Sequence, residues 1–202
     1  MVEPTYQEEE KLKKKGYLKV AGLDEAGRGA WAGPIVAASV ILNPRIRVDG
    51  LRDSKQLSPT RRKQLYIEIV KNALNWSVGI VSEKTIDRIG INDANALAME
   101  QAVKKLILRP DYLLVDYFLL DHVGIEHHAI TKGDQKVASI AAASIIAKVT
   151  RDFIMVEAHK DYPEYNFHAH KGYGTEHHQK KIEKYGICKI HRISFSPMKD
   201  LV

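Results

Sequence analysis

Cysteine is nearly absent from this chain of 202 residues, in which Cys188 stands alone. A disulfide within the chain is therefore impossible, which is typical of proteins of the reducing cytosol, and we expect a cytoplasmic location. No apolar run is long enough to cross a bilayer as a helix, so we expect no membrane contact. The first residues, MVEPTYQEEEKLKKK, are charged and lack the apolar centre of a signal peptide.

Acidic residues are the minority among the charged ones, because 25 Asp and Glu stand against 31 Lys and Arg, for a formal net charge of +6. A basic balance favours an anionic partner, and nucleic acid is the commonest one, although charge alone also fits proteins that bind no polyanion. No cysteine accompanies the run of His168, His170, His177 and His178. Their spacing matches no closed zinc site, so we expect partly exposed histidines rather than bound zinc.

Runs rich in Val, Ile, Leu and Tyr, bounded by Gly, Asn or Asp, predict strands at 17–23, 34–42, 76–81, 112–115 and 125–131. Caps, prolines and apolar spacing predict helices at 58–74, 96–110, 135–159 and 175–185. This mixture indicates an α/β fold with a mixed sheet. The composition shifts to Tyr, His, Lys and Gly after Pro163, so we expect a main unit over 1–162 and a small helical appendage over 163–202.

Four carboxylates are attached to apolar elements of the predicted fold. Asp24 and Glu25 end one apolar run, and Asp116 ends the run YLLV at the carboxyl end of another strand, where open α/β sheets usually bind ligands. Asp152 lies on the apolar stripe of the 135–159 helix, a costly position unless the carboxylate is paired or metal-bound. Because successive strand residues point to opposite faces, Asp24 and Glu25 can share a site only if the strand ends there and the following AGRG bends the chain.

Clustered carboxylates repel one another, and a divalent cation removes that cost. Ligation by oxygen alone suits Mg²⁺ or Mn²⁺ rather than zinc. Two such ions about 4 Å apart can activate a water and stabilise the leaving oxygen of a phosphodiester. A basic protein with a local acidic site therefore fits a metal-dependent nuclease. Each acid taken singly also fits a solvated turn or a structural acid, so the prediction depends on their joint placement.

Six sequence blocks resemble, in this order, the motifs of the ribonuclease HII (type 2 ribonuclease H) family, and together they cover most of 22–197. They are DEAGRG with AGPIVAA, LRDSKQLS at 51–58, LLVD at 113–116, KGDQKVASIAAASIIAKVTRD at 132–152, HKGYGT at 170–175 and HRISFSP at 191–197. The resemblance implies a ribonuclease H-like fold, which is an α/β fold with a mixed β-sheet flanked by helices, plus a small C-terminal helical extension. One departure is Tyr117, where the family usually has glycine. A bulky side chain there either narrows the site or points into the core.

The resemblance also implies a reaction, the metal-dependent cleavage of RNA joined to DNA on the 5′ side of a ribonucleotide, which leaves a 3′-hydroxyl and a 5′-phosphate. The family's metal-binding acids map onto Asp24, Glu25, Asp116 and Asp152, with Mg²⁺ or Mn²⁺ as cofactor. The implied partners are RNA–DNA hybrids and duplex DNA with embedded ribonucleotides, and the implied task is their removal. No obvious association helix is present, so we expect a monomer.

Several residues near these acids are implied to bind the substrate. The backbone of Gly27, Arg28 and Gly29 would read the 2′-hydroxyl at an RNA–DNA junction, the group that distinguishes RNA from DNA. Arg28 can also hold a phosphate. Tyr173 would stack on the sugar of the following deoxynucleotide, although an aromatic between two glycines also suits a hydrophobic anchor. Lys55 would contact a phosphate.

Ser144 and Lys148 precede Asp152 by eight and four residues, near its side of the helix. Both can reach phosphates of the scissile strand, and Lys148 can equally be the ion-pair partner of Asp152 one turn away. Two rival functions stay open: a DNA-only nuclease or resolvase of the same fold, and a non-catalytic hybrid-binding protein. The glycine turn with Tyr173 argues against the first, and the presence of four acids argues against the second.

Overall fold

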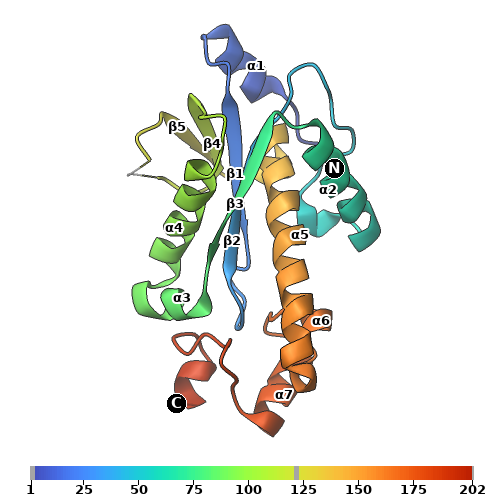
Figure 1. Ribbon diagram of the computed structural model, residues 1–202, viewed down its shortest axis with the longest axis vertical. Helices are drawn as coiled ribbons and strands as arrows, with labels where there is room; N and C mark the ends of the chain where they lie inside the picture. Colours follow the sequence, from blue (N-terminus) through green and yellow to red (C-terminus); the bar gives the residue numbers. More distant parts are fainter. Residues whose placement is uncertain (1–2, 121–122, 202) are drawn as a thin grey trace.

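A five-stranded mixed sheet forms the centre of the computed structural model, which describes residues 3–120 and 123–201 (Figure 1). The strands are β1 (Val20–Ala26), β2 (Ile35–Ile41), β3 (Asn75–Val81), β4 (Tyr112–Asp116) and β5 (His127–Ile130). Their order across the sheet is β3-β2-β1-β4-β5. Because β1, β4 and β5 are parallel, their carboxyl ends lie at the same end of the sheet, while β2 and β3 complete it as antiparallel strands.

Helices cover both faces of the sheet, as Figure 1 shows. They are α2 (Pro59–Asn72) and α5 (Ala138–Asp161) on one face, and α3 (Glu83–Ile89) and α4 (Ile91–Lys104) on the other. In β2, Ala38 and Val40 belong to the core under α5, whereas Ala37 and Ile41 belong to the core under α4. This alternation is that of a strand buried on both faces. The expected mixed sheet flanked by helices is confirmed.

The long helix α5 lies directly on β1 because small residues line both elements. A Cβ on Gly22 would lie 2.1 Å from the carbonyl carbon of Ser139, so only glycine permits this approach. Alanines 141, 142, 143 and 147 of α5 are fully buried in the same core. The close contact fixes the position of α5 along the strand that carries Asp24 and Glu25.

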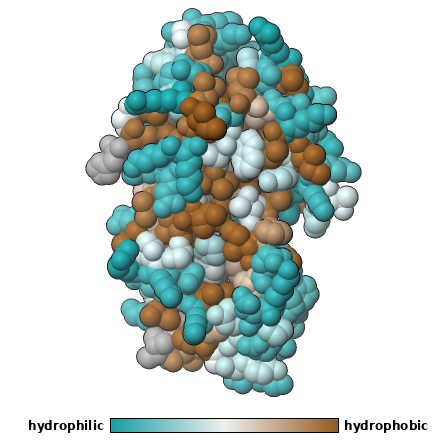
Figure 2. All heavy atoms as spheres, viewed as in Figure 1, coloured by the Kyte–Doolittle hydropathy of each residue, from teal (hydrophilic) through white to brown (hydrophobic). Residues whose placement is uncertain are grey.

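The chain after α5 forms a small helical extension, and a short helix precedes the sheet. These elements are α1 (Gln7–Lys14), η3 (Pro163–Tyr165), α6 (Phe167–His170), α7 (Glu176–Tyr185) and η4 (Met198–Leu201). Tyr165 and Phe167 pack with Ala32 and with Met155 of α5, which joins the extension to the main body. Hydrophilic and apolar residues are interspersed over the face seen in Figure 2. No helix among the described residues is long and apolar enough to span a membrane.

The structure moves several predicted boundaries. β1 starts three residues later than the predicted 17–23 strand and continues to Ala26, so Asp24 and Glu25 lie within the strand rather than beyond it. The bend predicted after Glu25 falls at Gly27, whose φ of +95° only glycine adopts readily. Neither α1 nor α3 was predicted, and α4 begins at Ile91, five residues before the predicted start. The caps Ser58 and Thr175 are confirmed, since each side chain accepts an amide hydrogen bond at the start of its helix.

Candidate active site

Three carboxylates meet at the carboxyl end of the parallel strands. Asp24 lies in β1, Asp116 ends β4, and Asp134 lies in the short helix η2 (Gly133–Gln135) that follows β5. Each offers an oxygen within 4.8 Å of an oxygen of the other two. Asp24 and Asp134 are buried, and Asp116 is half-buried. Two strands and a short helix that are far apart in sequence thus bring their acids to one point.

Strand register explains how Asp134 reaches Asp116. Asp116 pairs with Ile130 at the end of β5, after which the chain turns back at Lys132, a residue with a left-handed φ of 57°. The turn points the amide of Gly133 at Asp116, and this amide donates a 2.7 Å hydrogen bond to Oδ1 of Asp116. Asp134 follows immediately, so the turn that orients one carboxylate also places the other.

Glu25 lines the open side of this group. A cavity of about 300 Å³ has Glu25, Asp116 and Asp134 in its walls together with Arg28 and Lys55. Burial raises the pKa of Glu25, and the charge of Asp116 raises it further, while Arg28 works in the opposite direction. The side chain of Glu25 therefore belongs to the same electrostatic site as the three clustered carboxylates.

Burial and mutual repulsion raise the pKa values of the clustered acids. Burial is the largest cause for Asp24, followed by the charges of Glu25 and Asp116. Burial and the neighbouring charges of Asp53 and Asp116 raise the pKa of Asp134 to about 6. Burial likewise raises the pKa of Asp116. The ionised cluster is costly by itself, and a divalent cation ligated by these oxygens would remove that cost, so the residues fit such an ion.

Lys55 supplies a positive charge beside the acids. Burial acts to lower its pKa, but the carboxylates of Asp53, Asp24 and Asp134 outweigh burial, and the pKa is raised. Asp53 holds the segment in place by accepting the amide hydrogen of Lys55 at 2.9 Å. Lys55 is thus a cation held near, but not within, the group of carboxylate oxygens.

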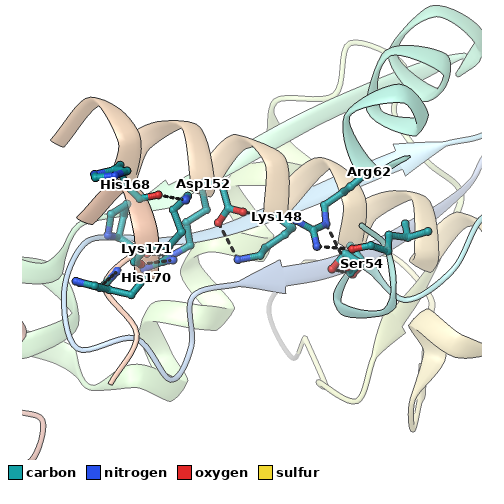
Figure 3. Close-up of polar contacts among 12 residues, drawn as sticks. Ser54, Arg62, Lys148, Asp152, His168, His170 and Lys171 are labelled. Carbon is teal, nitrogen blue, oxygen red and sulfur yellow. Dashed lines mark hydrogen bonds and ion pairs between the residues drawn. The ribbon is translucent and has the colours of Figure 1, made fainter. Parts of the chain in front are cut away.

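Asp152 does not join this group, which departs from the sequence expectation. Its Oδ1 lies 2.7 Å from Nζ of Lys148 and its Oδ2 lies 3.7 Å from Nη1 of Arg62, and Figure 3 shows the carboxylate turned toward Lys148. Two cations therefore neutralise the carboxylate of Asp152 on the helix. They offset the cost of burying its charge, as a metal ion would. Among the described residues, the carboxylate group that could hold a metal ion contains Asp134 in the place where Asp152 was expected.

The sequence contained one pattern that could have identified Asp134. Asp134 follows the predicted strand at 125–131 by a few residues, much as Asp116 follows the run YLLV, and it lies at the start of the block KGDQKVASIAAASIIAKVTRD, whereas Asp152 ends that block. The two strands that precede Asp116 and Asp134 are parallel neighbours. Acids just beyond neighbouring parallel strands converge, whereas an acid on a long helix has no such constraint.

The glycine-rich segment and Tyr173 form a second cavity next to the acids. This cavity of about 470 Å³ is lined by Glu25, Gly27, Arg28, Gly29 and Tyr173, and also by Ser54, Lys55 and Lys148. Ala30 and Tyr173 form an isolated β-bridge, and the space above Gly29 is open. Glu25 and Lys55 line both cavities. The structure therefore brings together the residues that the sequence associates with sugar recognition and places them beside the carboxylates.

Two buried arginines, which the sequence analysis missed, hold this segment. Arg151 is fully buried and donates to the carbonyl oxygens of Pro34 at 2.9 Å, Lys171 at 2.9 Å and Ala32 at 3.0 Å. Arg192, also fully buried, donates to the carbonyls of Gly33 and Arg28. Buried guanidinium groups need several acceptors, and irregular backbone with free carbonyls provides them. They fix the glycine-rich segment against α5 and the extension.

Of the two residues of α5 that were expected to contact phosphates, Ser144 is buried and Lys148 lines a cavity. Ser144 is only 3% exposed, and its hydroxyl donates to Oγ of Ser54 at 2.8 Å. Ser144 is also one of the neighbours that lower the pKa of Asp24, so it lies in the interior beside this acid rather than facing a phosphate. Lys148 makes the ion pair with Asp152 and also lies 5.0 Å from the centroid of the Tyr173 ring, in the cavity wall.

The expectation of partly exposed histidines is wrong for His178, which is fully buried in the extension and pairs with His191. Nδ1 of His178 lies 3.0 Å from the carbonyl oxygen of Tyr173 and must donate to it. Nε2 of His178 therefore accepts from Nε2 of His191 at 3.1 Å, and Nδ1 of His191 accepts the amide hydrogen of Cys188 at 2.8 Å. Burial lowers the pKa of His178 to about 3 and of His191 to about 4, so both rings are neutral at pH 7. This chain of hydrogen bonds runs from the Cys188 amide through His191 and His178 to the carbonyl oxygen of Tyr173.

Comparison with known proteins agrees with the sequence motifs. The family model described as ribonuclease HII matches residues 21–198. The ribonuclease HII of Caldicellulosiruptor bescii is 48% identical over 190 residues, which cover 94% of this chain and 92% of that protein. The ribonuclease HII of Acetivibrio thermocellus is 52% identical over 188 residues, or 93% of this chain and 73% of that protein. The crystal structure of ribonuclease H2 from Pyrococcus horikoshii is similar with a TM-score of 0.77 at 29% identity, covering 91% of this chain and 97% of that one.

Proposed function

The chain belongs to the ribonuclease HII family and is an endonuclease of the ribonuclease H type, and we propose that it cuts the phosphodiester on the 5′ side of a ribonucleotide joined to DNA. The observation that carries the proposal is that Glu25 lines both the carboxylate cavity and the cavity formed by the glycine turn and Tyr173. A sugar held in the second cavity would present its phosphodiester to the first.

In this proposal Asp24, Glu25, Asp116 and Asp134 hold Mg²⁺ or Mn²⁺. Bound ions of this kind lower the pKa of an attacking water and stabilise the charge that develops on the leaving oxygen. The half-buried, oxygen-only donor set suits these ions rather than zinc. Gly133 keeps one oxygen of Asp116 in a fixed direction through its amide, and the amide of Glu25 donates to Oδ1 of Asp24 at 2.7 Å.

The chain's own groups would select the ribonucleotide. The backbone of Gly27, Arg28 and Gly29 can approach a sugar closely, since no side chain covers Gly29, and peptide groups offer both a donor and an acceptor to a 2′-hydroxyl. The Tyr173 ring, across the same cavity, would pack on the following deoxyribose and would meet an added hydroxyl there.

The cations around the cavities would hold the phosphates. Lys55 and Lys148 line the cavity of the glycine turn, and Arg28 lines both cavities. We assign to Asp152 the role of positioning Lys148 through their 2.7 Å ion pair, in place of the metal-binding role expected from the sequence. The extension over 163–202 contributes Tyr173 and is proposed as the substrate-binding part of a cytoplasmic monomer.

Three labelled duplexes test the proposed function in one experiment. They are an all-DNA duplex, an RNA–DNA hybrid, and a DNA duplex with one ribonucleotide, each incubated with Mg²⁺ and again with an excess of chelator. We expect cleavage of the last two in Mg²⁺ alone, with the single-ribonucleotide strand cut on the 5′ side of the ribonucleotide. Cleavage of the all-DNA duplex at a similar rate would instead identify a DNA nuclease, and binding without any cleavage would identify a hybrid-binding protein.

A further inference from the structure

Tyr117 has an unusual conformation for an exposed tyrosine. Its φ is +58°, in the left-handed region that costs free energy for any residue with a side chain. The amide of Phe118 donates to the carbonyl of Asp116 at 2.7 Å, so Tyr117 is the central residue of a three-residue turn, and a positive φ at that position is the strained form of such turns.

Burial of the Tyr117 side chain offsets little of this strain, although the Tyr117 amide donates to the carbonyl of Ile130 at 3.1 Å. The Tyr117 side chain is 74% exposed, so the ring gains little from burial and does not point into the core. The neighbouring Phe118 packs against the core under α4, and Leu120 is only 2% exposed within that core. The turn therefore buries the residues after Tyr117 and leaves this ring outside. Strained backbone conformations of this kind cluster at functional positions.

The ring lies where a substrate must pass. Tyr117 directly follows Asp116, and it lines the carboxylate cavity together with Glu25 and Asp134. Arg28, Lys55 and Lys132 surround the same cavity with positive charge, which would draw a phosphate backbone over the ring. Tyr173 lines the neighbouring cavity, so the two tyrosines line different cavities that share Glu25 and Lys55.

We propose that Tyr117 is a substrate-contact residue whose ring packs on the sugars of the duplex next to the scissile phosphodiester. This inference rests on the proposed function, and it assigns a second aromatic contact to the same site. An exposed aromatic ring beside a sugar–phosphate backbone strengthens binding without selecting a base. Because the ring touches the substrate before and during cleavage alike, its loss should raise KM and leave kcat nearly unchanged.

The test uses Tyr117→Asn, because asparagine tolerates the left-handed region and does not add the backbone freedom that glycine would give the unfolded chain. Tyr117→Phe keeps the ring, and Leu18→Ala removes an apolar side chain of similar exposure, 68%, that lies just before β1 at the opposite end of the sheet. KM and kcat are measured for all three and for wild type on the single-ribonucleotide duplex in Mg²⁺ at one salt concentration, and Tm is measured by thermal unfolding.

We expect Tyr117→Asn to raise KM by about tenfold, with kcat within about twofold of wild type and Tm equal or higher. Tyr117→Phe and Leu18→Ala should behave as wild type. An unchanged KM in Tyr117→Asn would overturn the inference, as would a loss in Tyr117→Phe as large as in Tyr117→Asn, since the hydroxyl would then make the contact. Wild-type cleavage in the same assay tests the proposed function separately.

Discussion

Tyr173→Ala separates junction reading from simple anchoring. The ring has Nζ of Lys148 and Cζ of Arg151 each 5.0 Å from its centroid, so it lies between two cations at the wall of the cavity. The backbone of Tyr173 is held independently, because its amide donates to the carbonyl of His170 and its carbonyl accepts from His178. Alanine keeps those bonds, so the segment stays in place while the ring is removed.

The magnitude follows from the contact that is lost. A ring packed on a nucleotide contributes about 1–3 kcal/mol, so kcat/KM on the single-ribonucleotide duplex should fall by about ten- to a hundredfold. A cut within a long RNA–DNA hybrid has no deoxyribose at the next position, and its kcat/KM should fall less. The two lost cation–π contacts reduce stability by about 0.5–2 kcal/mol each, with the larger value for the buried Arg151, which should lower Tm but not change the ratio between substrates.

The assay is the ratio of kcat/KM on the two substrates, for wild type, Tyr173→Ala and Tyr173→Phe, at one salt concentration. Tyr173→Phe keeps the ring and should keep the wild-type ratio. An equal loss on both substrates in Tyr173→Ala would refute junction reading and leave Tyr173 as an anchor of the extension.

Four further outcomes are expected. Asp116→Asn should abolish most cleavage while duplex binding persists, and in chelator its free energy of unfolding should exceed that of wild type because carboxylate repulsion is relieved; turnover near wild type would remove Asp116 from the site. Ca²⁺ should support duplex binding with little cleavage because its looser coordination positions the water poorly; cleavage as fast as in Mg²⁺ would contradict this. Burial lowers the pKa of His178 to about 3 and of His191 to about 4, against 6.5 for an unperturbed histidine. At these two histidines the unfolded chain takes up protons below pH 6.5 that the folded chain excludes, so their contribution to stability should fall as pH falls from 6.5 to 4, by about 1.4 kcal/mol per pH unit and histidine, against the opposite contribution of the carboxylates with raised pKa values; relative to wild type, urea unfolding of His178→Gln should show a free energy of unfolding that falls less steeply with falling pH. Gly22→Ala should prevent α5 from seating on β1, because the new Cβ would lie 2.1 Å from the backbone of Ser139; a soluble variant with wild-type Tm would refute this.

The sheet and its flanking helices were predictable because apolar runs record burial directly. The run YLLV gave β4 and the acid that ends it, and the caps Ser58 and Thr175 marked the starts of α2 and α7. The predicted strand ended at residue 23, three residues before the observed end of β1 at Ala26, because Asp24 and Glu25 interrupt the apolar pattern inside the strand. A strand can carry acids where its end forms a site. A prediction from composition alone then places the end of that strand too early.

The site was only partly predictable because pairing across the fold decides it. Asp152 on an apolar stripe required a partner, and an arginine can neutralise a carboxylate as a metal can. Arg62 lies far earlier in the chain, and only the packing of α2 beside α5 brings it to Asp152. Asp134 meets Asp116 through the parallel register of β4 and β5, which single-strand patterns do not reveal. Arg151 is charged and yet fully buried, and its acceptors are backbone carbonyls that have no sequence signature.

In the proposed catalytic centre Asp24, Glu25, Asp116 and Asp134 hold the metal, and Asp152 lies outside it. Single-turnover cleavage of the single-ribonucleotide duplex at saturating Mg²⁺, by Asp134→Asn and Asp152→Asn side by side, tests this assignment most directly. Loss of a ligand that stabilises transition-state charge should slow Asp134→Asn by about a hundredfold or more. Loss of an ion pair at the cavity wall should slow Asp152→Asn by less than about tenfold. The reverse order, with Asp152→Asn inactive and Asp134→Asn near wild type, would contradict the account.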